Sequence, residues 1–234
     1  FEKHLDIVWP AIADPNVKYV KIFRSEDNKT FIPVGIQSRR FNRYSDYVDA
    51  IDKEFYYKIT LLNAGYQESP FSNVVSAVTK KMTDEQWLDM VQRANFQYYW
   101  EGAEPQSGMS LENIPGHQNM IASGASGFGI MALIVGTERK FITRAQAIER
   151  FDRITKFLEK ADKFHGAFSH FMDGRTGKVE PFFGSNDNGG DLVETSFLMQ
   201  GLLAAQQYLG GNNESERSIR ERIHKIWVGV VWSW

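Results

Sequence analysis

The stretch Val74–Val91 reads VVSAVTKKMTDEQWLDMV, and one type of secondary-structure pattern gives way to another within it. Before Lys80 the residues are mostly short and apolar with several valines, which is typical of a strand. Thr83 and Gln86 then form the Ser/Thr-x-x-Glu/Gln pattern of a capping box, which marks the first turn of a helix. The chain of 234 residues is therefore predicted to divide here into a β part and a helical part.

On the N-terminal side, short apolar or aromatic runs alternate with turn residues. Asn63-Ala64-Gly65 and Glu68-Ser69-Pro70 supply the turn chemistry. The predicted strands are residues 5–9, 20–23, 31–36, 55–62 and 74–78. Short strands with such spacing are typical of a β-sandwich.

On the C-terminal side, the apolar residues recur with helical spacing. The predicted helices are residues 84–100, 121–135, 143–158, 192–209 and 214–228. Gly124, Gly127 and Gly129 lower the helix propensity of the second one and indicate close packing against a neighbour. Residues 168–183 contain Asp173-Gly174 between aromatic runs, which predicts either a hairpin or a long structured loop. Long loops inside helical domains are often functional.

Composition excludes several functional classes. The 27 basic and 29 acidic residues are mixed along the chain, so no polyanion-binding surface is expected and nucleic acid is not a predicted partner. The absence of cysteine excludes disulfides, thiolate metal sites and cysteine nucleophiles. No apolar run reaches the roughly 20 residues needed to span a bilayer. The cysteine-free composition fits a periplasmic or secreted protein of a bacterial envelope.

Two segments of the β part resemble strands of a fibronectin type III module. Residues 5–9 (LDIVW) resemble its Trp-bearing second strand, and residues 57–65 (YKITLLNAG) resemble its Tyr-x-Val-x-Ala-x-Asn strand. The resemblance implies a sandwich over residues 1–80, with Trp9 in the core and Tyr57 as the corner tyrosine. Such modules usually space, dock or support a catalytic neighbour.

Four motifs in the helical part carry a second resemblance. They are FQYYWE at 96–101, GASGFG at 124–129, HGAFSHF at 165–171 and GGDLVETSFLMQGL at 189–202. Their order and spacing resemble a glucoamylase-like bacterial glycoside hydrolase family that is related to endo-β-1,2-glucanases. The resemblance implies that residues 83–234 are the N-terminal part of an (α/α)6 toroid. The predicted fold class is thus a multidomain β plus α chain, with a fibronectin III-like sandwich followed by an incomplete toroid.

Asp191 and Glu194 are the candidate catalytic residues. Cleavage of a glycosidic bond needs two carboxyl groups, one to protonate the leaving oxygen and one to act as base or nucleophile. At spacing i, i+3 the two side chains share a helix face, with β-carbons about 5–6 Å apart. The same Asp-x-x-Glu pattern at a helix start is also that of a cap, in which Asp191 accepts a hydrogen bond from the Glu194 amide. The resemblance places this pair in the sugar-binding cleft.

Five further residues are candidates for substrate binding, most of them with a structural alternative. Glu101 follows an aromatic run and is either a cleft residue or a surface carboxylate. His170 and Asp173 flank the expected hairpin, where they are expected to bind hydroxyls, and the alternative for His170 is to satisfy a buried backbone group. Asp187 precedes the Gly-Gly turn and either lines the cleft or forms the turn. Trp100 is expected either to stack on a sugar or to pack in the core. The same two alternatives apply to Phe182 and Phe183.

Neither a metal nor another cofactor is predicted. The histidines show no i, i+4 pair and no His-x-His cluster; they are His4, His117, His165, His170 and His224. A toroid of twelve helices needs on the order of 300 residues, and the part after the sandwich has room for five helices. Together with the apolar run at 226–234, this predicts a chain cut inside its second domain.

The predicted function is hydrolysis of a β-linked glucan of the β-1,2 type by carboxylate general acid–base catalysis. The predicted partner is an oligo- or polysaccharide. The parent protein is expected to be the enzyme, and this polypeptide is expected to lack part of the active site. The alternative is a non-catalytic carbohydrate-binding or envelope scaffold protein.

Overall fold

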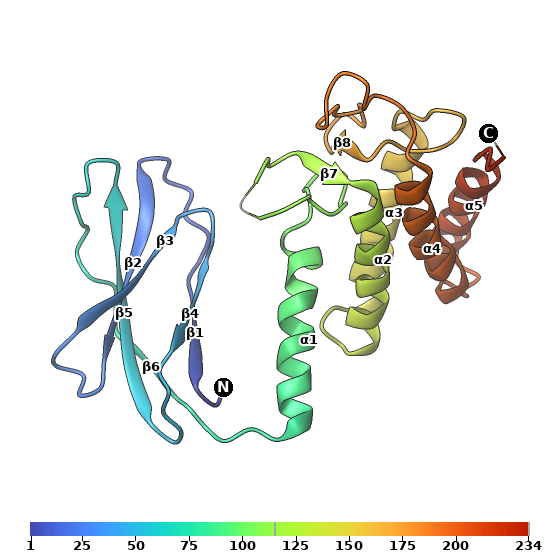
Figure 1. Cartoon of the computed structure of the whole chain (residues 1–234). Coiled ribbons are helices and arrows are strands. Elements are labelled where there is room, and N and C mark those ends of the chain that lie inside the picture. The colour runs from blue at the N-terminus through green and yellow to red at the C-terminus, as the bar shows by residue number, and fades with distance from the viewer. Residues whose placement is uncertain (115, 234) are drawn as a thin grey trace. The chain divides into compact units, whose positions relative to one another are not determined.

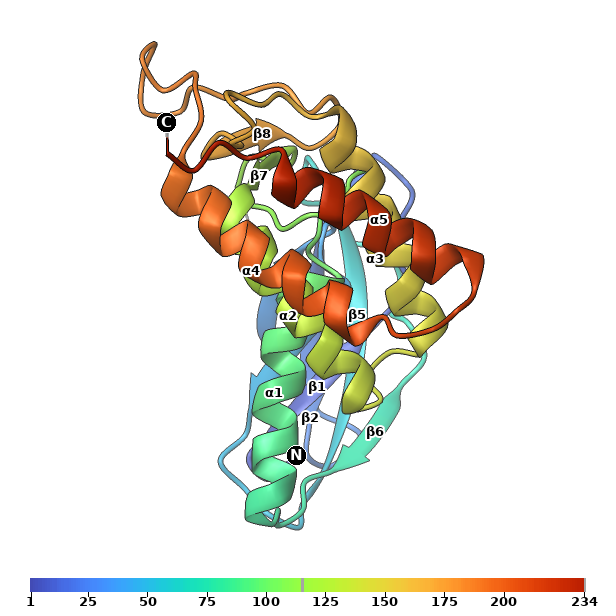
Figure 2. The ribbon, with the colours of Figure 1, turned by 90° about the vertical axis from the view of Figure 1, so that its right-hand side faces the viewer.

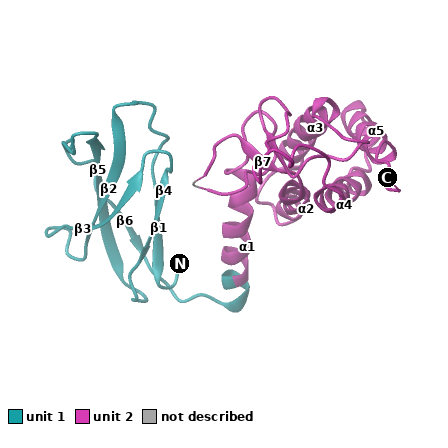
Figure 3. Ribbon diagram, turned by 45° about the horizontal axis from the view of Figure 1, so that its top comes forward, with its two compact units in different colours: residues 1–87 teal, residues 88–234 magenta. Residues whose placement is uncertain are grey.

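The computed structural model describes residues 1–114 and 116–233, so Trp234, the last residue of the apolar run noted above, lies outside the described residues. The chain forms two compact units, one of residues 1–87 and one from Leu88 onward (Figure 3). The structure therefore has a β-rich first unit and a helical second unit, as the change of pattern near Lys80 predicts.

The first unit contains six strands in two antiparallel sheets (Figure 1). The strands are β1 (His4–Val8), β2 (Val17–Ser25), β3 (Ile32–Ser38), β4 (Arg43–Tyr47), β5 (Glu54–Asn63) and β6 (Val75–Val78). One sheet pairs β1 with β4, and the other has the order β3-β2-β5-β6. The β4 strand is absent from the sequence prediction because Arg43–Tyr47 lacks an alternation of apolar residues.

Inward-facing residues of both sheets form the core of the first unit. Trp9 is buried, as expected, and packs in one cluster with Phe55 and Tyr57. The Tyr57 hydroxyl donates a hydrogen bond of 2.8 Å to Asp46, which is also paired with Arg24 at 3.0 Å. Burial, together with the Asp46 carboxylate, raises the pKa of Tyr57 far above its usual value. These three side chains form a closed polar network inside the sandwich.

The described residues of the helical part form five helices and one short two-stranded sheet. The helices are α1 (Asp84–Trp100), α2 (Ser123–Glu138), α3 (Arg144–Lys160), α4 (Leu192–Tyr208) and α5 (Glu214–Val228). The strands are β7 (Met120–Ala122) and β8 (Phe171–Asp173), which pair antiparallel. The predicted capping box at the start of α1 is present: Thr83 and Gln86 exchange backbone-to-side-chain hydrogen bonds.

Helices α2 and α4 lie side by side and pack closely (Figure 2). A β-carbon on Gly127 would lie 2.1 Å from the Phe197 carbonyl oxygen, and one on Gly201 would lie 2.3 Å from the Gly127 carbonyl oxygen. Only glycine permits so short an approach of two backbones. The close packing predicted from the glycines of α2 is thus confirmed. Because Gly124 contacts Glu194 and Gly127 contacts Phe197, the two helices run in the same direction.

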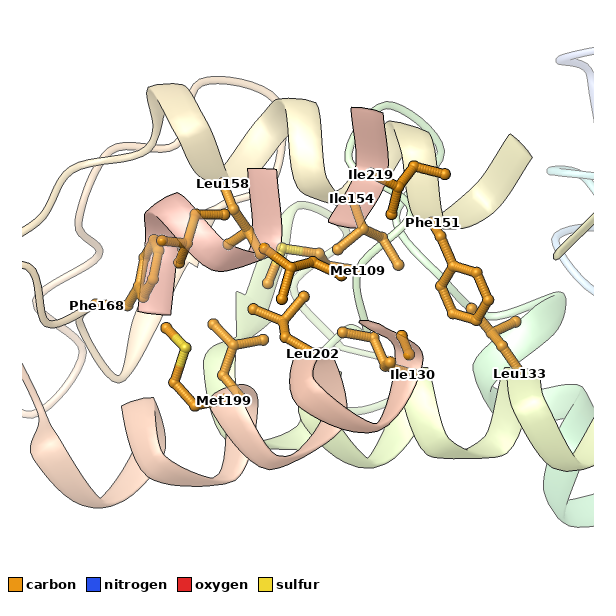
Figure 4. Packing of buried hydrophobic residues seen from close by; sticks show 14 of the residues in the cluster. Met109, Ile130, Leu133, Phe151, Ile154, Leu158, Phe168, Met199, Leu202 and Ile219 are labelled. Carbon is orange, nitrogen blue, oxygen red and sulfur yellow. The ribbon is translucent and has the colours of Figure 1, made fainter. Parts of the chain in front are cut away.

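Helices α3 and α5 form a second layer against α2 and α4. Figure 4 shows the interface, where Phe151, Ile154 and Leu158 of α3 face the other layer. Ile130 and Leu133 of α2, together with Met199 and Leu202 of α4, fill the opposite side. The apolar core fixes the helix pair α2 and α4 and therefore the residues at their N-termini.

The segment between α3 and α4 combines features of a hairpin with those of a long structured loop, the two alternatives predicted from the sequence. Residues 173–177 form a tight turn closed by the Gly177 amide, which donates to the Asp173 carbonyl oxygen at 2.8 Å. Met172 and Val179 form one antiparallel bridge across this turn. The strand β8 also pairs with the distant β7, so it lies between β7 and the residues that follow the turn.

No helix in the described part of the chain is both long and apolar enough to cross a membrane.

Candidate active site

Asp191 is the N-cap of α4. Its Oδ1 accepts hydrogen bonds from the amides of Val193 (2.9 Å) and Glu194 (3.0 Å), which satisfies two donors of the first helical turn. Its Oδ2 lies 3.1 Å from Nδ1 of His170. The capping interpretation of Asp191 is therefore confirmed, and the carboxylate also has a histidine partner.

Glu194 does not fold back onto the Asp191 amide as a capping box requires. Its Oε2 accepts a hydrogen bond of 2.9 Å from the Gly124 amide in the first turn of α2. The contact is possible because α2 and α4 run in the same direction and place their N-termini at the same end (Figure 1). A helix N-terminus favours negative charge, so Asp191 and Glu194 lie where two helix dipoles favour carboxylates.

Backbone and hydroxyl contacts hold the residues behind this pair. The Phe168 amide donates to Oγ1 of the buried Thr195 at 2.9 Å, and the Asp191 amide donates to the Phe168 carbonyl oxygen at 2.8 Å. The Ser123 amide donates to the His170 carbonyl oxygen at 3.1 Å. Residues 168–170 are thus tied to the first turns of both helices, which fixes the position of the His170 ring.

Asp187 closes a turn next to this site. Its Oδ2 accepts a hydrogen bond of 3.2 Å from the Phe183 amide. The Phe183 ring in turn lies edge to face against His170, with centroids 5.3 Å apart. The structure therefore places the Asp191 carboxylate in contact with His170 and with the Glu194 amide. It connects Asp187 to His170 through Phe183.

The three remaining candidates have other partners or positions. Asp173 is 7% exposed and pairs with Arg175 at 2.8 Å, which, with two amide donors in the turn, lowers the pKa of Asp173 to about 2. Trp100 packs in the core against Phe96, with the Arg150 guanidinium over its ring. Glu101 is exposed immediately after the end of α1. For all three, a role in substrate binding stays a prediction.

Sequence reasoning missed the role of Gly124. A β-carbon there would lie 2.4 Å from Oε2 of Glu194, so the carboxylate occupies the space that a side chain would fill. The available signal was a glycine at the start of a helix, directly after an apolar run. The partner was not predictable because it lies 70 residues away in the chain.

The comparisons with known proteins place these features in context. No protein-family model matches the chain. The chain is 56% identical over 234 residues to the exo β-1,2-glucooligosaccharide sophorohydrolase (non-reducing end) of Parabacteroides distasonis. The crystal structure of a β-1,2-glucanase from Parabacteroides distasonis matches 100% of the chain with 57% identity and a TM-score of 0.93.

The resemblance of the helical part to relatives of endo-β-1,2-glucanases, predicted from the sequence, is confirmed. An endo-β-1,2-glucanase from Chitinophaga pinensis, solved with sophorotriose and glucose, matches 66% of the chain at 49% identity with a TM-score of 0.62. The chain covers 32% of the sophorohydrolase, 33% of the Parabacteroides glucanase structure and 38% of the Chitinophaga one. All of the chain matches the two Parabacteroides proteins, and it spans about a third of the length of each.

Proposed function

We propose that the protein containing this chain is a glycoside hydrolase that acts on β-1,2-linked glucan. The observation that carries this proposal is the meeting of Asp191 and Glu194 at the N-termini of two parallel helices. The similarity to a β-1,2-glucooligosaccharide sophorohydrolase and to two β-1,2-glucanases indicates the substrate class.

In the proposed reaction, water is added across a glycosidic bond. One carboxyl group donates a proton to the leaving oxygen, and a carboxylate removes a proton from water or attacks the anomeric carbon. Asp191 and Glu194 are the residues of this chain proposed for these roles. Both are half-buried, and the amides that hold them come from the helix ends. Their geometry is therefore set before a substrate arrives, which lowers the cost of reaching the transition state.

The finer description of the fold belongs to the same proposal. We infer that residues 1–80 form a fibronectin III-like module, supported by the two antiparallel sheets and by the buried Trp9 and Tyr57. We infer that residues 83–234 are the first part of an (α/α)6 toroid, supported by the two layers of helices and by the parallel pair α2 and α4. A periplasmic or secreted location belongs to the same proposal and is supported by the cysteine-free composition.

A second candidate function is binding of the glucan without cleavage, in a carbohydrate-binding or scaffold protein of the envelope. The full engagement of Asp191 favours it, since this carboxylate accepts two amide hydrogen bonds and contacts His170. A carboxylate with this many partners is well suited to hold its neighbours in place.

Release of reducing sugar distinguishes the two functions. This chain and the complete gene product are incubated with β-1,2-, β-1,3- and β-1,4-glucans and with an α-glucan. We expect the complete product to cleave the β-1,2-glucan, and Glu194→Gln to lower the rate at least about 100-fold. Glu149→Gln, an exposed glutamate of α3, is the matched control and should leave the rate unchanged. The absence of cleavage by the complete product would leave the binding function.

A further inference from the structure

Two consecutive phenylalanines on the segment before α4 are largely exposed. Phe182 is 62% exposed and Phe183 is 67% exposed. Their rings lie edge to face, with centroids 5.3 Å apart and an interplanar angle of 81°. Apolar surface in contact with water is unfavourable, so two adjacent exposed rings indicate a binding surface.

The Phe183 ring contacts His170, which in turn contacts the candidate catalytic carboxylate of Asp191. It meets the His170 ring at 5.3 Å and 83°, and it also packs against the buried Phe171 at 5.6 Å. His170 in turn lies 3.1 Å from Asp191 through Nδ1 and Oδ2. An aromatic surface and a polar edge are thus adjacent at the same end of α4.

Hydrogen bonds fix the turn that carries the two rings. The Phe182 amide donates to the Glu180 carbonyl oxygen at 2.8 Å, and the Phe183 amide donates to Asp187. The Asp187 amide donates back to the Gly184 carbonyl oxygen at 2.9 Å. Gly184 has φ of 122°, a conformation that strongly favours glycine. The backbone that carries the two rings is therefore held by its own hydrogen bonds, so little backbone entropy would be lost on binding.

The arrangement matches the chemistry of a pyranose ring. Such a ring has an apolar face of C–H groups and a rim of hydroxyls, so it needs an aromatic face and hydrogen-bonding groups side by side. Phe71 of the first unit is also exposed and lies edge to face against Phe23, with centroids 5.1 Å apart. Phe71 belongs to the other compact unit from Asp191 and Glu194, which makes it a suitable comparison.

We propose that Phe182 and Phe183 form a sugar-stacking subsite that binds one glucose unit of the glucan beside Asp191. Phe183 contacts the C–H face of that unit, and the hydroxyls meet the polar edge formed by His170 and Asp191. Phe182 and Asp187 hold the Phe183 ring in place. This inference rests on the proposed function and adds the residues that select a stacked sugar at that site.

Calorimetric titration of the complete gene product with a β-1,2-linked glucotriose tests the subsite, with Glu194→Gln in every variant to prevent cleavage. We expect Phe183→Ala to weaken binding about tenfold, since stacking on one ring is worth on the order of one decade in affinity. Phe183→Tyr, which keeps the ring, should stay within about threefold of the product with Phe183 unaltered. Phe71→Ala is the control for a general loss of exposed aromatic surface and should leave the affinity unchanged.

The outcomes separate this inference from the proposed function. Equal affinities of Phe183→Ala and the product with Phe183 unaltered, with binding lost in Asp191→Ala, would overturn the stacking subsite and leave the proposed function intact. Equal weakening by Phe183→Ala and Phe71→Ala would also overturn the subsite. A complete gene product that binds no glucotriose would overturn the subsite as well, and the release of reducing sugar would then decide the proposed function separately.

Discussion

Both units contain hydrogen-bonded carboxylates, but these are held in different ways. In the first unit, Asp46 is 5% exposed and is enclosed by Arg24 and Tyr57. In the second unit, Asp191 and Glu194 are half-buried and accept hydrogen bonds from backbone amides at helix ends. The enclosed carboxylate of Asp46 is shielded from ligands, whereas the half-buried carboxylates of Asp191 and Glu194 are partly accessible to one.

The largest expected effect on stability concerns the enclosed carboxylate. Asp46→Ala leaves Arg24 and Tyr57 without their shared partner, and removal of one member of a buried ion pair costs about 3 kcal/mol. We expect the free energy of unfolding of the first unit to fall by about that amount in a denaturant titration. Glycan binding by the folded variant should not change. A loss below about 0.5 kcal/mol would show that the Asp46 network contributes little.

How far the sequence predicts these features depends on the distance between partners in the chain. The start of α1 follows from Thr83 and Gln86, and the cap of α4 follows from Asp191 and Glu194, because both signals lie within one helical turn. The contact of Glu194 with Gly124 and the pairing of β8 with β7 join residues about 50–70 positions apart, so no local pattern reports them. The ring contact of Phe183 with His170 likewise depends on how a long segment folds back.

Asp173 is a buried carboxylate of the helical unit, and its expected contribution to stability lies between those of Asp46 and Asp191. The Arg175 side chain and two amides lower its pKa to about 2, so its contribution to stability is fully present above about pH 4 and is lost as the pH falls toward 2. Arg175 is about half exposed, and with solvent screening we expect about 1.5 kcal/mol. Acid unfolding of Asp173→Asn should lack this pH-dependent component. An identical acid transition in the variant would show that Asp173 does not stabilise the turn.

The smallest expected effect on stability is that of Asp191→Asn. This variant separates the role of Asp191 as a helix cap from its proposed role in catalysis. Asp191→Asn keeps an N-cap oxygen, so the free energy of unfolding should change by a few tenths of a kcal/mol, whereas Asp191→Ala should lose about 1 kcal/mol. Both variants lack the carboxylate, and we expect both to lose cleavage of β-1,2-glucan by the complete gene product. Full cleavage by Asp191→Asn would restrict Asp191 to the role of a cap.

The most direct test of the paired helix ends is a comparison of kcat between Gly124→Ala and Gly129→Ala in the complete gene product. Each new β-carbon meets a side chain, Oε2 of Glu194 at 2.4 Å in the first variant and Oγ of Ser110 at 2.6 Å in the second, so similar losses of stability are expected. Only Gly124→Ala displaces the Glu194 carboxylate, and we expect its kcat to fall at least about tenfold while that of Gly129→Ala stays within about twofold. Equal kcat values in the two folded variants would contradict a catalytic role for the Glu194 carboxylate held by the Gly124 amide.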